Sequence, residues 1–149
     1  MVASVNEHQT SLCIERSIEI NAPIQVAYDA LLEQLGPASQ MPDGTSMPMK
    51  LEARPGGRWF RDLGDDTGHW WATVQVIKPP KLIELTGPLF MSYPALSHLQ
   101  YRLVEQGDST LLEFTHRAIG ELDPDHCKGV QTGWDHKMQQ IKAAAESAV

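Results

Sequence analysis

Apolar and polar residues alternate along most of this chain, and helical spacing replaces the alternation in two segments. Apolar residues of one parity run from Leu12 to Ile20, which predicts a first strand with one buried face. From Pro23 to Leu35, apolar residues recur every three or four positions, which predicts an amphipathic helix. Asn21 is a suitable N-cap for this helix, and Gly36-Pro37 ends it.

Six further strands are expected between this helix and a second one. Short turns rich in Gly, Pro and Asp separate them, which favours antiparallel pairing of neighbouring strands. The predicted strands cover residues 49–54, 58–63, 69–78, 81–86, 97–105 and 110–118. In the long strand 69–78, parity places four residues toward the core, namely Trp70, Ala72, Val74 and Val76.

The second helix is expected over about residues 125–147, with Asp123 or Asp125 as its cap. One face carries the apolar residues Val130, Trp134, Met138 and Ile141. A sheet without helical crossovers needs this helix as its cover, and a gap between a curved sheet and the helix would be a pocket. Gly129 and Gly133 weaken the first half of the helix, where we expect it to bend or to act as a gate.

Four segments, in this order and at this spacing, resemble a known family. They are Ile18–Pro23 with Val26, Ala27, Tyr28 and Leu31; Pro55–Trp59; Val74–Ile77 with Pro79–Leu82; and Gly133-Trp134 with Met138, Ile141 and Lys142. Together they resemble the START-like superfamily (SRPBCC, birch-pollen-allergen-like). Within it, the chain is similar to the branch of the C-terminal domain of the heat-shock-protein-90 ATPase activator.

The resemblance implies an α+β helix-grip fold. In this fold a curved, mostly antiparallel sheet of about six or seven strands wraps around a long C-terminal helix, and an N-terminal helix follows strand 1. The chain of 149 residues has room for one such domain, expected over residues 12–149 after a frayed N-terminus at residues 1–11. Members bind lipids, hormones and polyketides, and some are cyclases or hydrolases, so the resemblance implies a cavity without one function.

Charge and composition exclude several classes of partner. The formal net charge is −7 and no basic run occurs, which argues against nucleic acid and anionic membrane surfaces. No apolar run approaches the ~20 residues of a membrane span, and the N-terminus lacks the pattern of a signal peptide. Cys13 and Cys127 lie far apart, which predicts reduced thiols in a cytoplasmic protein, with one disulfide still open.

The candidate site is the apolar gap beneath the final helix, where strand parity and the helical stripe bring aromatic side chains together. The predicted ligand-binding residues are Trp70, Tyr101, Phe114, His116, Gln131, Trp134 and Met138. Trp71 has the opposite parity and is expected to face outward, as a contact for a homodimer or another protein. Met41, Met47 and Met49 either fill the edge of the core or form an adaptable lid.

His116 has two interpretations. It is either a hydrogen-bonded core residue or a group that orients the ligand or serves as a base near neutral pH. Gln131 and Asp135 are possible partners for it. No nucleophile is paired with a base, so no catalytic residue is assigned. The six histidines show no metal-binding spacing, so no metal or cofactor is expected.

The sequence therefore favours a small-molecule binding protein whose apolar cavity takes a hydrophobic, lipid-like or aromatic ligand. Two alternatives stay open. One is a cyclase, dehydratase or hydrolase that uses the same cavity, with His116 as acid or base. The other is a protein-interaction or chaperone-associated module that uses Trp71 and the Pro-rich loops.

Overall fold

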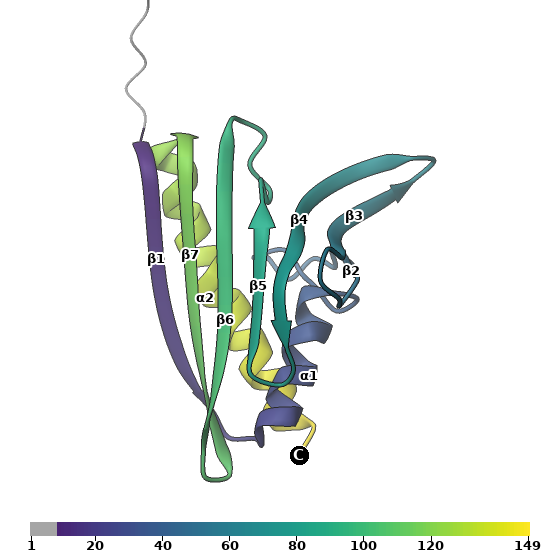
Figure 1. Ribbon diagram of the computed structural model, residues 1–149, viewed down its shortest axis with the longest axis vertical. Helices are drawn as coiled ribbons and strands as arrows, with labels where there is room; N and C mark the ends of the chain where they lie inside the picture. The colour runs from purple at the N-terminus through teal and green to yellow at the C-terminus, as the bar shows by residue number, and fades with distance from the viewer. Residues whose placement is uncertain (1–8) are drawn as a thin grey trace, which may run out of the picture.

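The computed structural model describes residues 9–149 as a seven-stranded sheet with two helices (Figure 1). The elements are β1 (Gln9–Ile20), α1 (Ile24–Leu35), β2 (Lys50–Leu51), β3 (Arg58–Gly64), β4 (Thr67–Lys78), β5 (Leu82–Gly87), β6 (Ala95–Gln106), β7 (Ser109–Leu122) and α2 (Pro124–Ser147). The strand order is β1-β7-β6-β5-β4-β3-β2, and every neighbouring pair is antiparallel. None of the helices in residues 9–149 is long and apolar enough to cross a membrane.

Helix α2 crosses one face of the sheet, behind β7 and β6 in the view of Figure 1, and α1 packs beside its C-terminal half. Strands β3 and β4 bend away from the other strands, so the sheet is open and curved. This arrangement confirms the predicted α+β helix-grip fold. Asp123 caps α2, as one of the two expected residues, because its carboxylate accepts hydrogen bonds from the N–H groups of Asp125 and His126.

The element bounds differ from the predictions mainly at the ends. β1 begins at Gln9, so residues 9–11 of the segment predicted as frayed belong to a strand, and residues 1–8 lie outside the described residues. β7 continues four residues beyond the predicted end, to Leu122. The strand predicted over 49–54 is reduced to β2, since the backbone beyond it already turns, with the Arg54 N–H bonded to the Glu52 carbonyl.

A β-bulge in β4 reverses the predicted orientation of two tryptophans. Trp59 pairs with Ala72, whereas the next residue, Phe60, pairs with Trp70, so Trp71 is an extra residue in the ladder. The bulge turns Trp71 inward, where it is 8% exposed, and leaves Trp70 51% exposed. The predictions that Trp70 faces the core and Trp71 faces outward are therefore wrong.

A second irregularity in β4 changes the side that Val76 faces. Val74 pairs with Leu85 but Val76 pairs with Glu84, so the register shifts at Gln75. Val74 is buried as predicted, whereas Val76 is only half-buried and Ile77 packs against the core instead. Parity therefore holds only between bulges.

Where the ladders are regular, the strands follow the predicted parity. The inward positions of β6 and β7 are all buried, namely Leu99, Tyr101, Leu103, Leu112, Phe114 and His116. The apolar stripe of α2 is buried as well, at Val130, Trp134, Met138 and Ile141. All of these apolar residues belong to one core cluster, so the helix covers the sheet through the face that the sequence predicts.

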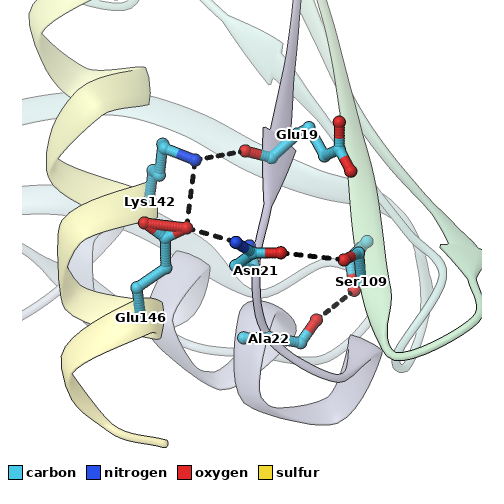
Figure 2. A network of polar contacts seen from close by, with 7 residues as sticks. Glu19, Asn21, Ala22, Ser109, Lys142 and Glu146 are labelled. Carbon is cyan, nitrogen blue, oxygen red and sulfur yellow. Dashed lines mark hydrogen bonds and ion pairs between the residues drawn. The ribbon is translucent and has the colours of Figure 1, made fainter.

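The C-terminal end of α2 is tied to the junction between β1 and α1 (Figure 2). Lys142 Nζ donates to the Glu19 carbonyl at 2.6 Å and to Glu146 Oε2 at 3.0 Å. The same Glu146 oxygen accepts from the backbone N–H of Asn21 at 2.9 Å. Asn21 is therefore used as a tether, and its predicted role as N-cap is wrong, because Pro23 occupies that position without a side-chain bond.

Thr110 makes a buried contact at this junction, since its hydroxyl donates to the Ala22 carbonyl at 2.8 Å. We expect Thr110→Val to lower the free energy of unfolding by about 1–3 kcal/mol, because the carbonyl would stay buried without its partner. Ser109→Ala is the control, since it removes only an exposed bond to Asn21 Oδ1 and should cost less than ~0.5 kcal/mol. Urea unfolding measures both, and equal costs would contradict the assignment.

Candidate functional site

A pocket of about 390 Å³ lies beneath the first half of α2. The loop between α1 and β2 (residues 36–49), strands β3 and β4 and the segment after β5 form its other walls. The lining residues are Ser39, Gln40, Met41, Pro42, Met47, Trp59, Trp71, Phe90, His126, Gly129, Val130, Gly133, Trp134 and Lys137. The lining is therefore mostly apolar, with a few polar groups, a composition typical of small-molecule sites.

Two glycines of α2 leave part of this space free. Gly129 and Gly133 are four residues apart, and Lys137 follows at the same spacing, so all three share one side of the helix. A Cβ at Gly129 would meet no atom within 4 Å, and one at Gly133 would lie 3.7 Å from Pro42 Cγ. Longer side chains here would enter the gap between α2 and the 36–49 loop.

Four aromatic rings form a continuous wall. The ring centroids of Trp59 and Trp71 are 5.1 Å apart, and those of Trp71 and Phe90 are 5.4 Å apart, both in edge-to-face geometry. Phe90 then lies 6.0 Å from Trp134. Such ring pairs stabilise one another beyond the burial of their area, so the four rings hold one another in place.

Trp134 is held from behind by His116. The indole Nε1–H donates to His116 Nδ1 at 2.9 Å, and His116 Nε2 lies 3.0 Å from Ser97 Oγ. Because an indole N–H can only donate, Nδ1 has to be the unprotonated nitrogen and Nε2 carries the proton. Ser97 in turn donates to Met91 Sδ at 3.6 Å.

Burial also determines the charge of His116. The side chain is fully buried, and loss of solvation lowers the pKa of its imidazole to about 4, so the ring is neutral at pH 7. His116 does not line the pocket, since Trp134 stands between. Of the two interpretations from sequence, the structure supports the hydrogen-bonded core residue, which here fixes the orientation of Trp134.

Lys137 brings a cation to the end of the pocket near α1. Its Nζ donates to the Gln34 carbonyl at 3.0 Å and to Ser39 Oγ at 3.2 Å. Gln34 belongs to the last turn of α1, whose carbonyls lack partners within the helix. The next carbonyl, that of Leu35, accepts from Trp59 Nε1 at 2.7 Å. Two pocket residues therefore also complete the end of α1.

His126 belongs to the first turns of α2 and marks another part of the lining. Its Nδ1 lies 2.6 Å from the Tyr93 hydroxyl, and its ring meets Phe90 edgewise at 5.7 Å. These contacts hold the segment after β5 against α2.

Within residues 9–149, no group of three His, Cys, Asp or Glu side chains is placed to bind a metal ion. Cys13 and Cys127 are both free thiols.

The structure brings together only part of the predicted site. Trp134 lines the pocket, whereas Tyr101, Phe114, His116 and Met138 are packed in the core and are absent from the lining. Trp70 and Gln131 are exposed, outside the pocket. The pocket therefore lies nearer the start of α2 than predicted.

Most of the lining residues were not among the predicted ligand-binding residues. Of the three methionines considered as a lid, Met41 and Met47 line the pocket, while Met49 is buried in the core. The sequence signal for the residues of α2 was available in the spacing of Gly129, Gly133 and Lys137. Two glycines and one lysine on the same side of a helix leave space and bring a charge.

Two predicted contacts are corrected. Asp135 does not partner His116, because its carboxylate forms a salt bridge with Arg16 of β1 at 2.6 Å. Trp71 is not an exposed contact for another protein, since it is buried in the pocket wall. The exposed tryptophan of this hairpin is Trp70. A homodimer stays a prediction.

Comparison with protein families gives one match that covers most of the chain. A family described as "Activator of Hsp90 ATPase homolog 1-like protein" matches residues 21–146. This range includes α1, all of α2 except its last residue, and the whole pocket lining. No curated protein matches the chain.

Solved structures with the same fold are distant in sequence. CalU16 from Micromonospora echinospora is 20% identical, with a TM-score of 0.59 over 91% of this chain and 75% of its own. A putative uncharacterized protein from Rhizobium leguminosarum is 20% identical, with a TM-score of 0.66 over 93% and 97%. The di-domain ARO/CYC StfQ from the steffimycin biosynthetic pathway is 14% identical, with a TM-score of 0.65 over 93% and 52%, so this chain spans about half of it. At such identities the likeness shows the fold alone.

Proposed function

This chain belongs to the Activator of Hsp90 ATPase homolog 1-like family, and we propose that it binds a small aromatic or otherwise apolar molecule in the pocket beneath the first half of α2. The pocket volume of about 390 Å³ falls in the lower part of the range of about 300–1,000 Å³ that ligand sites occupy. That size favours a compact ring compound over a long acyl chain.

The aromatic wall is the main support for this proposal. Trp71, Phe90 and Trp134 hold one another in edge-to-face or tilted contacts, and His116 fixes the Trp134 indole from the core side. A wall that is already ordered loses little conformational entropy when a ligand binds. Met41 and Met47 of the 36–49 loop also line the pocket, and flexible thioether side chains adapt to ligands of different shape.

The two alternatives receive less support. Both ring nitrogens of His116 are occupied by Trp134 and Ser97, so the acid or base that the enzyme alternative needs is not free at the pocket. One structural neighbour is described as an ARO/CYC protein, but only its fold is shared. The chaperone-associated role stays a hypothesis. Its predicted interaction surface used Trp71, which is buried in the pocket wall.

A variant that fills the pocket tests the proposal. We expect Gly133→Leu to weaken binding of 2-naphthamide at least about tenfold, because the new side chain competes for the space beside Pro42. Gly133→Ala is the matched control: its methyl would lie 3.7 Å from Pro42 Cγ, an ordinary contact, and should change affinity less than ~3-fold. Isothermal titration calorimetry measures both.

The outcome of this titration decides the proposal. Both substitutions remove a glycine from a helix and should raise stability by as much as about 1 kcal/mol, so lost binding in the leucine variant cannot be ascribed to unfolding. If wild type and the leucine variant bind the probe equally, the pocket is not the binding site. If wild type binds no naphthyl probe with a dissociation constant below ~1 mM, the proposal fails.

A further inference from the structure

Lys137 is a buried cation in a mostly apolar pocket. Only 9% of the residue is exposed, and it is part of the pocket lining. Its two hydrogen-bond partners, the Gln34 carbonyl and the Ser39 hydroxyl, are both uncharged. Among the described ion pairs of residues 9–149, none involves Lys137. The positive charge is therefore buried without a counter-charge.

Burial of this unpaired charge costs free energy. A buried charge ordinarily requires a partner of opposite sign, because burial removes its solvation. The same loss of solvation lowers the pKa of the Lys137 ammonium to about 8, so most of it is still charged at pH 7. The cost would fall if a molecule in the pocket brought an anionic group to Nζ.

The local donors match a single carboxylate. An ammonium group has three N–H donors, and the described contacts of Lys137 use two of them. The Ser39 hydroxyl accepts from Lys137, so its own O–H can donate, and Ser39 is 2% exposed in the same lining. One ammonium balances a monoanion. A phosphate dianion would keep uncompensated charge, because no arginine lines this pocket.

We propose that the pocket selects a small aromatic carboxylate, whose anionic group pairs with Lys137 Nζ and whose ring lies against Trp71, Phe90 and Trp134. This inference rests on the proposed function and adds the chemical class of the ligand. The net charge of −7 gives no general attraction for anions. The selectivity comes from the one cation within the lining.

Two probes of nearly the same shape separate the contribution of charge to affinity from that of shape. 2-Naphthoate and 2-naphthamide share the ring system, but only the first is an anion at pH 7. Wild type should bind the naphthoate at least about tenfold more tightly, as expected for a charge-assisted contact. Lys137→Met should remove this preference, so that the two probes bind with affinities within ~3-fold of each other. Calorimetry at pH 7 gives all four dissociation constants.

Controls separate charge recognition from folding and from overall charge. Lys128→Met makes the same change in net charge on the exposed side of α2, outside the pocket, and should keep the preference for naphthoate. Lys137→Gln retains a donor for the Gln34 carbonyl and should lose the preference as the methionine variant does. Circular dichroism establishes that each variant is folded before titration.

The results distinguish the inference from the function on which it rests. If wild type binds both probes with equal affinity, the pocket binds apolar molecules and the role of Lys137 is wrong. If a folded Lys137→Gln variant still prefers naphthoate to naphthamide, another group binds the carboxylate and the inference is also wrong. If neither probe binds, the proposed function itself fails.

Discussion

Trp134→Ala should lower the free energy of unfolding by about 3–5 kcal/mol, the largest effect expected of any single substitution in the pocket. The side chain is 6% exposed and packs against Phe114, with ring centroids 4.7 Å apart. Truncation would leave a cavity between α2 and the sheet. It would also leave His116 Nδ1 buried without the donor that Trp134 supplies. Urea unfolding followed by far-UV circular dichroism measures the loss.

Two further variants divide this cost into its parts. Trp134→Phe keeps a ring in the wall but removes the N–H group, so we expect it to lose about 1–3 kcal/mol through the unpaired His116 nitrogen. Trp70→Ala removes the same side chain from an exposed position and should cost less than ~1 kcal/mol. Similar losses at Trp134 and Trp70 would contradict the assignment of Trp134 to the core side of the pocket.

Acid should destabilise the fold through His116. The pKa of its imidazole is about 4 in the folded protein, whereas the ordinary value of 6.5 applies to the unfolded chain. Above pH 6.5 the ring is neutral in both states. As pH falls from 6.5 toward 4, the unfolded chain binds a proton that the folded chain does not, so stability is lost. A difference of about 2.5 pKa units corresponds to about 3 kcal/mol, which is lost across this window.

His116→Gln is the control for the acid effect. The amide can accept from Trp134 and donate to Ser97 without titrating, so this variant should lack most of the loss between pH 6.5 and 4.5. Other carboxylates whose pKa values are lowered, such as those of Glu52 and Asp62, titrate alike in both proteins and cancel in the comparison. Parallel stability profiles would show that His116 is not buried in its neutral form.

Strand parity predicted the core well where the ladders are regular. In β6 and β7, alternation placed Tyr101, Phe114 and His116 inward, and all three are buried. In β4 it failed, because a bulge at Trp71 inserts one residue and reverses every side chain before it. A bulge is set by how two strands pair, and the sequence of one strand does not contain that information.

The position of the pocket was harder to predict than the fold. The helical stripe of α2 correctly identified Trp134 as a pocket residue, but it did not distinguish the half that packs solidly from the half that leaves space. That difference depends on Gly129 and Gly133, which have no side chains, and on where the 36–49 loop lies. His116 was predicted inward, but its partners Trp134 and Ser97 come from other elements and become visible only in three dimensions.

The four tryptophans provide the most direct test of binding beneath α2. Trp59, Trp71 and Trp134 line the pocket, whereas Trp70 is exposed on the neighbouring hairpin and serves as an internal control. The measurement is a titration of ¹⁵N-labelled protein with 2-naphthoate, followed through the four indole N–H signals. We expect the Trp71 and Trp134 signals to shift with one saturation curve while that of Trp70 stays in place. A shift confined to Trp70, or no shift at any concentration up to ~1 mM, would contradict ligand binding in this pocket.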